Sequence, residues 1–189
     1  LGDWVLQNAC IFIKRLEELG HKDIGVSVNI SILQLLQEDF VDKVMNLVHI
    51  YQIRPEQLEL EITESILVES FDRIKTKLQQ LREFHVRTAL DDFGKGYSSL
   101  SYLKQLPITT MKIDKSFIDY ITEQSEDDYV RNIISLGKNL GMDVIAEGVE
   151  EKYQLDYLVK SDCDKIQGFW FCKPKTEEDI IRMLGEAGI

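Results

Sequence analysis

The chain contains the segment Val86-Arg87-Thr88-Ala89-Leu90-Asp91-Asp92-Phe93-Gly94-Lys95-Gly96-Tyr97-Ser98-Ser99-Leu100, in which an apolar strand runs into two acidic residues and a glycine-rich turn. The adjacent carboxylates repel each other unless a cation lies between them, and their oxygens suit Mg²⁺ or Mn²⁺. A glycine-rich turn in which the second acidic residue caps the next helix is the alternative. A dinucleotide fingerprint is excluded, because serine stands where the third glycine belongs.

The same strand-then-helix order continues on both sides of this segment. Short β-branched or alternating stretches predict strands at 24–29, 58–63, 86–90, 110–113, 143–146 and 165–167. Apolar residues at helical spacing predict helices at 6–19, 32–51, 71–84, 128–140 and 152–159. Strands separated by helices indicate a parallel α/β sheet, because a parallel crossover needs about a dozen residues.

A polar residue lies at or just beyond the end of each of the six predicted strands. These residues are Asn29, Glu61 with Glu64, Asp91, Lys112, Glu147 and Gln167. In a closed (β/α)8 TIM-like barrel such strand ends converge on the face that holds the active site. An open doubly wound sheet would gather only those beside its switch point. The pattern therefore favours the barrel, and without repeats or linkers we expect one domain over residues 1–189.

Composition narrows the class of protein. The chain has 189 residues, a net charge of -11 and three scattered cysteines. The acidic balance argues against duplex nucleic acid as a partner. The cysteines are expected to be free thiols. No apolar run is long enough to span a membrane, so we expect a cytoplasmic domain whose parent protein is anchored, if at all, through an upstream segment.

Six short motifs, in order and in register, resemble the EAL phosphodiesterase family. They are Val28-Asn29-Ile30-Ser31, Glu61-Ile62-Thr63-Glu64, Asp91-Asp92-Phe93-Gly94 with Tyr97-Ser98-Ser99, Lys112-Ile113-Asp114, Ala146-Glu147-Gly148-Val149-Glu150, and Gln167-Gly168 ending near Lys173-Pro174. The resemblance implies an EAL-type barrel that hydrolyses cyclic di-GMP to linear pGpG with two Mg²⁺ or Mn²⁺ ions. It also implies bacterial second-messenger signalling, a homodimer, and an upstream sensor or diguanylate cyclase domain.

The resemblance also implies roles for individual residues. Metal ligands would be Asn29, Glu61, Asp91, Asp92 and Glu147, and the catalytic pair Glu147 and Lys112. Whether Glu147 is the base, a metal ligand or both stays open, as does whether Lys112 faces the phosphate or only pairs with a carboxylate. Glu64 would steady the glycine loop, and substrate or loop residues would be Gly94, Ser98, Asp114, Glu150 and Gln167.

Two departures from the family pattern affect these expectations. Lys95 replaces a small residue, often threonine, and either alters loop packing or adds a cation near the phosphates. The first strand, which carries the Glu-Ala-Leu signature, is absent, leaving the barrel short by about 60 of ~250 residues. We therefore expect the isolated chain to be inactive and to aggregate, dimerise through its open edge, or need upstream residues.

Two other functions are compatible with the residues. A receptor that binds cyclic di-GMP without cutting it would have the same ancestry, but such members usually lose carboxylates that are present here. An unrelated metal-dependent barrel hydrolase or aldolase would require the six motifs to be accidental. Hydrolysis of cyclic di-GMP is therefore the favoured hypothesis.

Overall fold

The computed structural model describes residues 2–64, 70–95, 100–123 and 128–187. The strands are β1 (Val26–Asn29), β2 (Leu58–Thr63), β3 (Arg87–Phe93), β4 (Thr110–Ile113), β5 (Asp143–Glu147) and β6 (Lys165–Gln167). The helices are α1 (Gly2–Glu18), α2 (Ile32–Leu35), α3 (Phe40–Tyr51), the 3₁₀ turn η1 (Pro55–Gln57), α4 (Phe71–Glu83), α5 (Leu100–Leu103), α6 (Lys115–Ile118), α7 (Tyr129–Asn139), α8 (Lys152–Lys160) and α9 (Glu177–Ala187).

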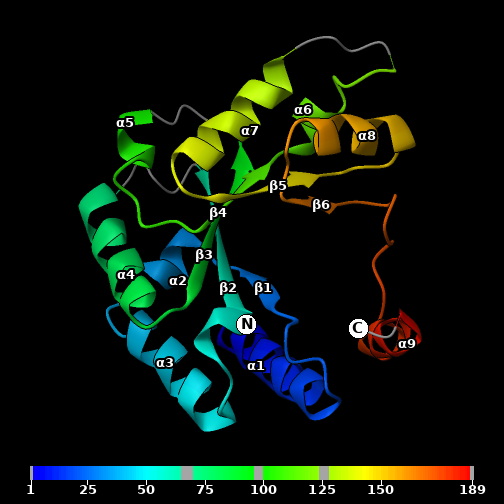
Figure 1. Cartoon of the computed structure of the whole chain (residues 1–189). Helices are drawn as coiled ribbons and strands as arrows, with labels where there is room; N and C mark the ends of the chain where they lie inside the picture. The colour runs from blue at the N-terminus through cyan, green and yellow to red at the C-terminus, as the bar shows by residue number, and fades with distance from the viewer. Residues whose placement is uncertain (1, 65–69, 96–99, 124–127, 188–189) are drawn as a thin grey trace. The chain divides into compact units, whose positions relative to one another are not determined.

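The strands are ordered β1-β2-β3-β4-β5-β6 in one sheet (Figure 1). The pairing of β1 with β2 is parallel, and so are the pairings of β3 with β4, β4 with β5, and β5 with β6. Parallel neighbours place their carboxyl ends at the same edge of a sheet. The predicted alternation of parallel strands and helices is therefore confirmed.

The chain divides into two compact units. Unit 1 comprises residues 1–61, 72–88 and 174–189, and unit 2 comprises residues 62–71 and 89–173. The expectation of one domain over the whole chain stays a prediction, and each unit is described separately below.

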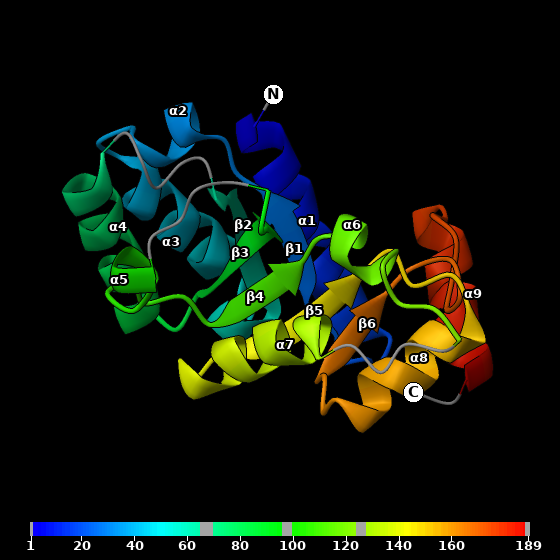
Figure 2. The same cartoon turned by 90° about the horizontal axis from the view of Figure 1, so that it is seen from above.

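In unit 2, strand β4 is covered on both faces. All four residues of β4 are buried, which is the pattern of a parallel strand between layers. Helix α7 packs on β5, with Val130, Ile134 and Gly137 buried at helical spacing (Figure 2). The one-turn helix α6 begins two residues after β4 and also contacts β5. These contacts fix the carboxyl ends of β4 and β5.

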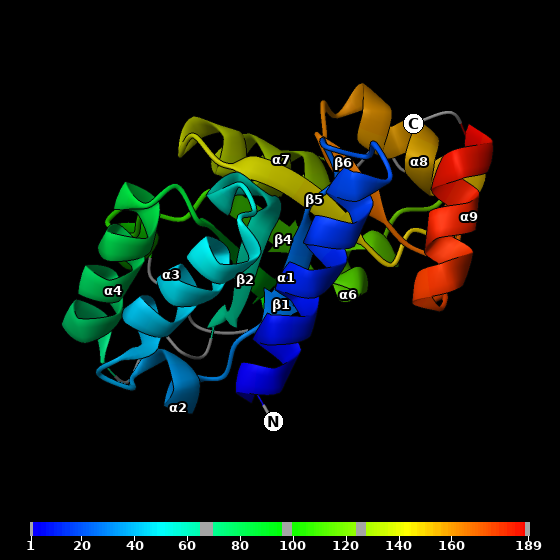
Figure 3. The same ribbon diagram turned by 90° about the horizontal axis from the view of Figure 1, so that it is seen from below.

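Unit 1 is held together by α1, which packs on α3 and on β1 (Figure 3). The buried face of α1 includes Leu6, Cys10 and Ile13, spaced four and three residues apart, as expected for one side of a helix. Cys10 has no exposed surface, and this burial raises the pKa of its thiol to about 11. The three cysteines are all free, as predicted.

The prediction of a single helix at 32–51 is wrong, because the helix is interrupted. Residues 36–39 are not helical, and α2 and α3 form instead. Ser31 starts α2 with a capping box, in which its hydroxyl accepts from Gln34 N–H and its N–H donates to the Gln34 side chain. Apolar residues continue at helical spacing across the break, so periodicity alone does not reveal it.

Among the described residues, none of the helices combines the length and the hydrophobicity that a membrane span requires.

Candidate active site

The site in unit 2 begins with an irregularity in β3. Leu90 pairs with Met111 and Phe93 pairs with Ile113, so β3 has one residue more than β4 over this stretch. The extra residue is a β-bulge, which bends a strand and redirects its side chains. Asp92, inside the bulge, has a φ of 56°, in the left-handed region. The sequence predicted that β3 ends at Leu90, whereas the strand continues through both aspartates to Phe93.

Lys112 on β4 lies between two carboxylates. Its Nζ is 3.0 Å from Asp91 Oδ1 and 2.8 Å from Glu147 Oε1, and the Lys112 side chain is only 5% exposed. The contact with Asp91 is an ion pair rather than a hydrogen bond, because buried Oδ1 has no partner of hydrogen-bonding geometry. Two opposite charges offset the desolvation of a buried ammonium group. Lys112 is therefore held at the carboxyl ends of β3, β4 and β5.

Three carboxylates converge beside this lysine. One oxygen each from Asp92, Asp114 and Glu147 lie within 4.8 Å of one another. The Lys95 ammonium contacts two of these groups, at 2.8 Å from Asp92 Oδ1 and 2.8 Å from Asp114 Oδ2. The cluster is thus rich in hard oxygen donors and only partly neutralised within the chain.

Asp114 also fixes the start of α6. Its Oδ1 accepts hydrogen bonds from Ser116 N–H at 3.0 Å and from the Ser116 hydroxyl at 2.6 Å. Partial burial would raise the pKa of Asp114, but the hydrogen bonds from Lys95 and Ser116 outweigh burial and lower the pKa to about 2. Asp114 is therefore ionised near neutral pH, and its second oxygen faces Lys95.

The glycine loop that follows the aspartates is tied to Glu64. Glu64 is buried, and its Oε2 accepts a hydrogen bond of 2.9 Å from Gly94 N–H. Gly94 has a φ of 103°, which favours glycine because a side chain there would be strained. Ser98, a predicted loop residue, lies outside the described residues.

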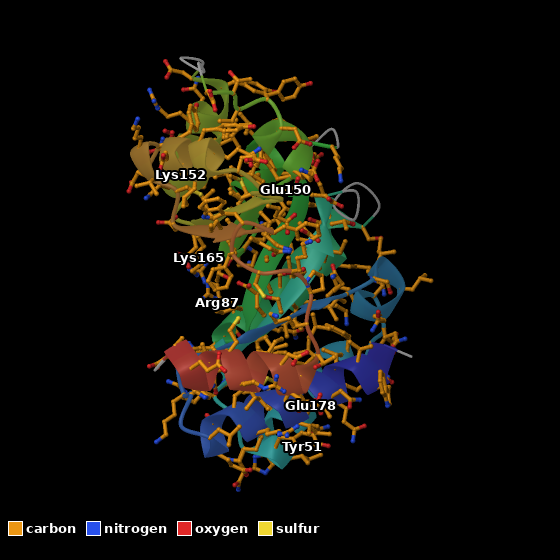
Figure 4. All side chains as sticks on the ribbon, turned by 90° about the vertical axis from the view of Figure 1, so that its right-hand side faces the viewer. Tyr51, Arg87, Glu150, Lys152, Lys165 and Glu178 are labelled. Carbon is orange, nitrogen blue, oxygen red and sulfur yellow. The ribbon has the colours of Figure 1, made fainter. Side chains whose placement is uncertain are left out.

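Two further candidates follow β5 and end β6. Glu150, which is labelled in Figure 4, follows β5. Its Oε1 lies 3.3 Å from Lys115 Nζ. Gln167 is exposed and pairs in register with Glu147. Its carbonyl oxygen accepts a hydrogen bond from Val149 N–H at 3.1 Å.

Asn29 and Glu61, the other two predicted metal ligands, belong to unit 1. They are register partners, with Asn29 at the end of β1 and Glu61 two residues before the end of β2. Glu61 is 7% exposed, whereas Asn29 is exposed. The structure thus groups Asp91, Asp92 and Glu147 in unit 2 and pairs Asn29 with Glu61 in unit 1. The five-residue ligand set stays a prediction.

Known proteins similar to this chain share one family. The family model described as EAL domain matches residues 1–174. The chain belongs to the EAL domain family. It is 38% identical over 182 residues to the bifunctional diguanylate cyclase/cyclic di-GMP phosphodiesterase MucR of Pseudomonas aeruginosa, covering 96% of this chain and 27% of MucR. The chain therefore spans about a quarter of that relative's length.

Solved EAL structures share the fold. The structure titled PaMucR phosphodiesterase, c-di-GMP complex, superimposes with a TM-score of 0.88 at 38% identity, covering 95% of this chain and 73% of that one. The EAL domain of Mycobacterium smegmatis DcpA gives a TM-score of 0.92 at 36% identity, covering 98% and 84% of the two chains. The predicted EAL-type barrel fold is confirmed by these likenesses.

Within this EAL domain, Lys115 contacts a predicted site residue but was not itself predicted. Its Nζ lies 2.8 Å from Asp119 Oδ1 and 3.3 Å from Glu150 Oε1, and these acidic partners raise the pKa of Lys115. Lys115 and Asp119 are four residues apart, which is the spacing at which oppositely charged side chains meet on a helix. The contact between these two residues could therefore have been predicted from the sequence. The contact with Glu150 depends on the fold.

The donor set in unit 2 fits a hard divalent cation. Asp92, Asp114 and Glu147 supply carboxylate oxygens, which Mg²⁺ and Mn²⁺ prefer. The buried Asp91 Oδ1, which accepts no hydrogen bond of standard geometry, is a further oxygen that suits a cation. Sulfur or imidazole ligands, which would favour zinc, are absent from this group of described residues.

Proposed function

We propose that this EAL domain hydrolyses one phosphodiester bond of cyclic di-GMP to give linear pGpG. The observation that carries the proposal is the convergence of Asp91, Asp92, Lys112 and Glu147 at the carboxyl ends of three parallel strands. Parallel barrels carry their catalytic groups at this end. The substrate is inferred from relatives named as cyclic di-GMP phosphodiesterases, among them MucR.

Divalent cations are part of the proposal. Asp91, Asp92 and Glu147 would hold Mg²⁺ or Mn²⁺, joined by Asn29 and Glu61, as the resemblance implies. Such an ion supplies a Lewis acid for the phosphoryl oxygen and activates water as a nucleophile at neutral pH.

The chain's own residues supply positioning and charge. The Lys112 ammonium, held by Asp91 and Glu147, would stabilise negative charge that develops on a phosphoryl oxygen. The Glu147 carboxylate can accept the proton of the attacking water. The hydrogen bond from Gly94 to Glu64 holds the loop that carries Asp92.

Substrate contacts and context are proposed on the same basis. Glu150 and Gln167, together with Gly94 and Ser98, would line the cyclic di-GMP pocket. We propose that the parent protein works as a homodimer in the cytoplasm and carries a sensor or diguanylate cyclase domain upstream. The bifunctional naming of MucR and the name of the oxygen sensor protein DosP of Escherichia coli support the upstream domain.

The test uses the full-length protein with cyclic di-GMP and Mn²⁺, and separates substrate and products by chromatography. We expect pGpG to accumulate, and a chelator to stop its formation. Asp91→Asn should abolish turnover and leave the circular dichroism spectrum unchanged, because only a donor oxygen is replaced. Tight binding of cyclic di-GMP without any pGpG would contradict hydrolysis and identify a receptor.

A further inference from the structure

Lys95 contacts the acidic cluster and has no role in the proposed chemistry. It follows the β3 bulge, and its N–H donates to the Asp92 carbonyl oxygen at 3.2 Å, which closes a tight turn. The hydrogen bond from Gly94 to Glu64 anchors the same turn from the other side. The backbone of Lys95 is thus fixed beside the carboxylates, whereas its side chain is 55% exposed.

The Lys95 ammonium occupies the space between two potential metal ligands. Its Nζ lies 2.8 Å from one oxygen of Asp92 and 2.8 Å from one oxygen of Asp114. Those two groups and Glu147 form the carboxylate cluster of unit 2. Mg²⁺ or Mn²⁺ bound to the same oxygens, at about 2.1 Å, would lie within a few ångströms of Nζ. Two cations at that separation repel each other strongly.

Lys95 differs from Lys112 in how easily it can leave. The Lys112 side chain is 5% exposed and is enclosed by Asp91 and Glu147. The Lys95 side chain is 55% exposed, so although Asp114 is only 8% exposed, the ammonium group borders solvent and its flexible side chain can turn away. Of these two lysines, Lys95 is the displaceable one.

We propose that Lys95 is a built-in competitor for divalent cations at the Asp92 and Asp114 oxygens. A metal ion that binds these oxygens displaces the ammonium group into solvent, so Lys95 weakens the ion's affinity and raises the metal concentration at which the site fills. The inference rests on the proposed function for the choice of Mg²⁺ or Mn²⁺. It concerns metal binding alone, so it is tested without turnover.

The experiment measures Mn²⁺ binding to the full-length protein by calorimetry, with free Mn²⁺ checked by electron paramagnetic resonance. Lys95→Met removes the charge but keeps the length. It should tighten Mn²⁺ binding at one site about five- to thirtyfold, since the metal no longer has to break the two ion pairs of a largely exposed ammonium group. Lys95→Arg keeps the charge and should bind Mn²⁺ like the unmodified protein. Lys160→Met is the matched control, because Lys160 is exposed at the end of α8, before β6 begins, and its loss changes net charge equally.

Displacement has a second readout in side-chain labelling. An amine-reactive reagent with detection by mass spectrometry should modify Lys95 faster when Mn²⁺ is added, and Lys160 at an unchanged rate. Mn²⁺ binding of Lys95→Met that is unchanged or weaker relative to Lys160→Met would overturn the proposal. Labelling of Lys95 that does not respond to bound Mn²⁺ would overturn it as well. If Lys95→Met binds Mn²⁺ more tightly but the unmodified protein does not hydrolyse cyclic di-GMP, the competitor proposal is supported and the proposed function is wrong.

Discussion

Among the glycines in the described part of the chain, Gly168, directly after β6, is the one at which an added side chain would come closest to backbone atoms. A Cβ atom added there would overlap the backbone N and O atoms of Val149 and approach its carbonyl carbon to 2.7 Å. Backbone atoms cannot rotate aside as a flexible side chain can. Gly168→Ala therefore forces the segment after β6 away from the segment after β5.

The cost can be worked out from the bonds at this contact. Val149 N–H donates to Gln167 O at 3.1 Å, and Trp170 N–H donates to Val149 O at 2.9 Å. Losing both costs about 1 kcal/mol each, and overpacking typically adds about 1–3 kcal/mol. We expect Gly168→Ala to lower the free energy of unfolding by about 3–5 kcal/mol and the melting temperature by roughly 10 °C.

The assay is urea and thermal denaturation followed by circular dichroism. Gly185→Ala is the matched control, because Gly185 lies inside α9 and an added Cβ meets no atom within 4 Å. That substitution should be neutral or stabilise the helix by up to about 1 kcal/mol. A Gly168→Ala protein within about 1 kcal/mol of the unmodified protein would show that the two segments are not in the close contact on which the estimate depends.

Two further predictions concern charge. Lys112→Ala should lower kcat for cyclic di-GMP by about 10²–10³-fold with little change in KM, because a cation aimed at developing charge acts mainly in the transition state. The measurement is steady-state kinetics. A rise in KM with unchanged kcat would instead make Lys112 a ground-state phosphate contact. Burial raises the pKa of the Cys10 thiol to about 11, so folding favours the neutral thiol. The thiol's contribution to the free energy of unfolding is therefore complete below about pH 9 and is lost as the pH rises to 11. Urea denaturation should show that the free energy of unfolding falls by up to about 3 kcal/mol between pH 9 and pH 11. In the Cys10→Ala protein the free energy of unfolding should change less over this range. An equally steep fall in that protein would assign the effect to other groups.

The strands were predictable because each is a short apolar run next to a polar terminus. The strands predicted at 110–113 and 165–167 have the observed bounds of β4 and β6. The one-turn helices α5 and α6 were not predicted, since four residues are too few to show a helical period. Helix α9 was also missed, although Ile180, Ile181 and Leu184 have helical spacing.

The site was predictable as a set of residue types but not as a set of contacts. Asp91, Lys112 and Glu147 were identified from their places at strand ends, and they do lie together. The partners of Lys95 could not be inferred, because they depend on the bulge in β3 and on the hydrogen bond from Gly94 to Glu64. A bulge is a feature of the pairing between two strands, so the sequence of one strand alone does not predict it.

The left-handed backbone of Asp92 places stability and function in opposition. A residue other than glycine at a φ of 56° is strained by roughly 1 kcal/mol, although aspartate and asparagine tolerate this region better than most residues. Glycine at position 92 would remove the strain together with the carboxylate that faces Lys95. Laboratory evolution of this chain for heat resistance alone would therefore tolerate Asp92→Gly, and variants that carried it would have lost a donor from the acidic cluster.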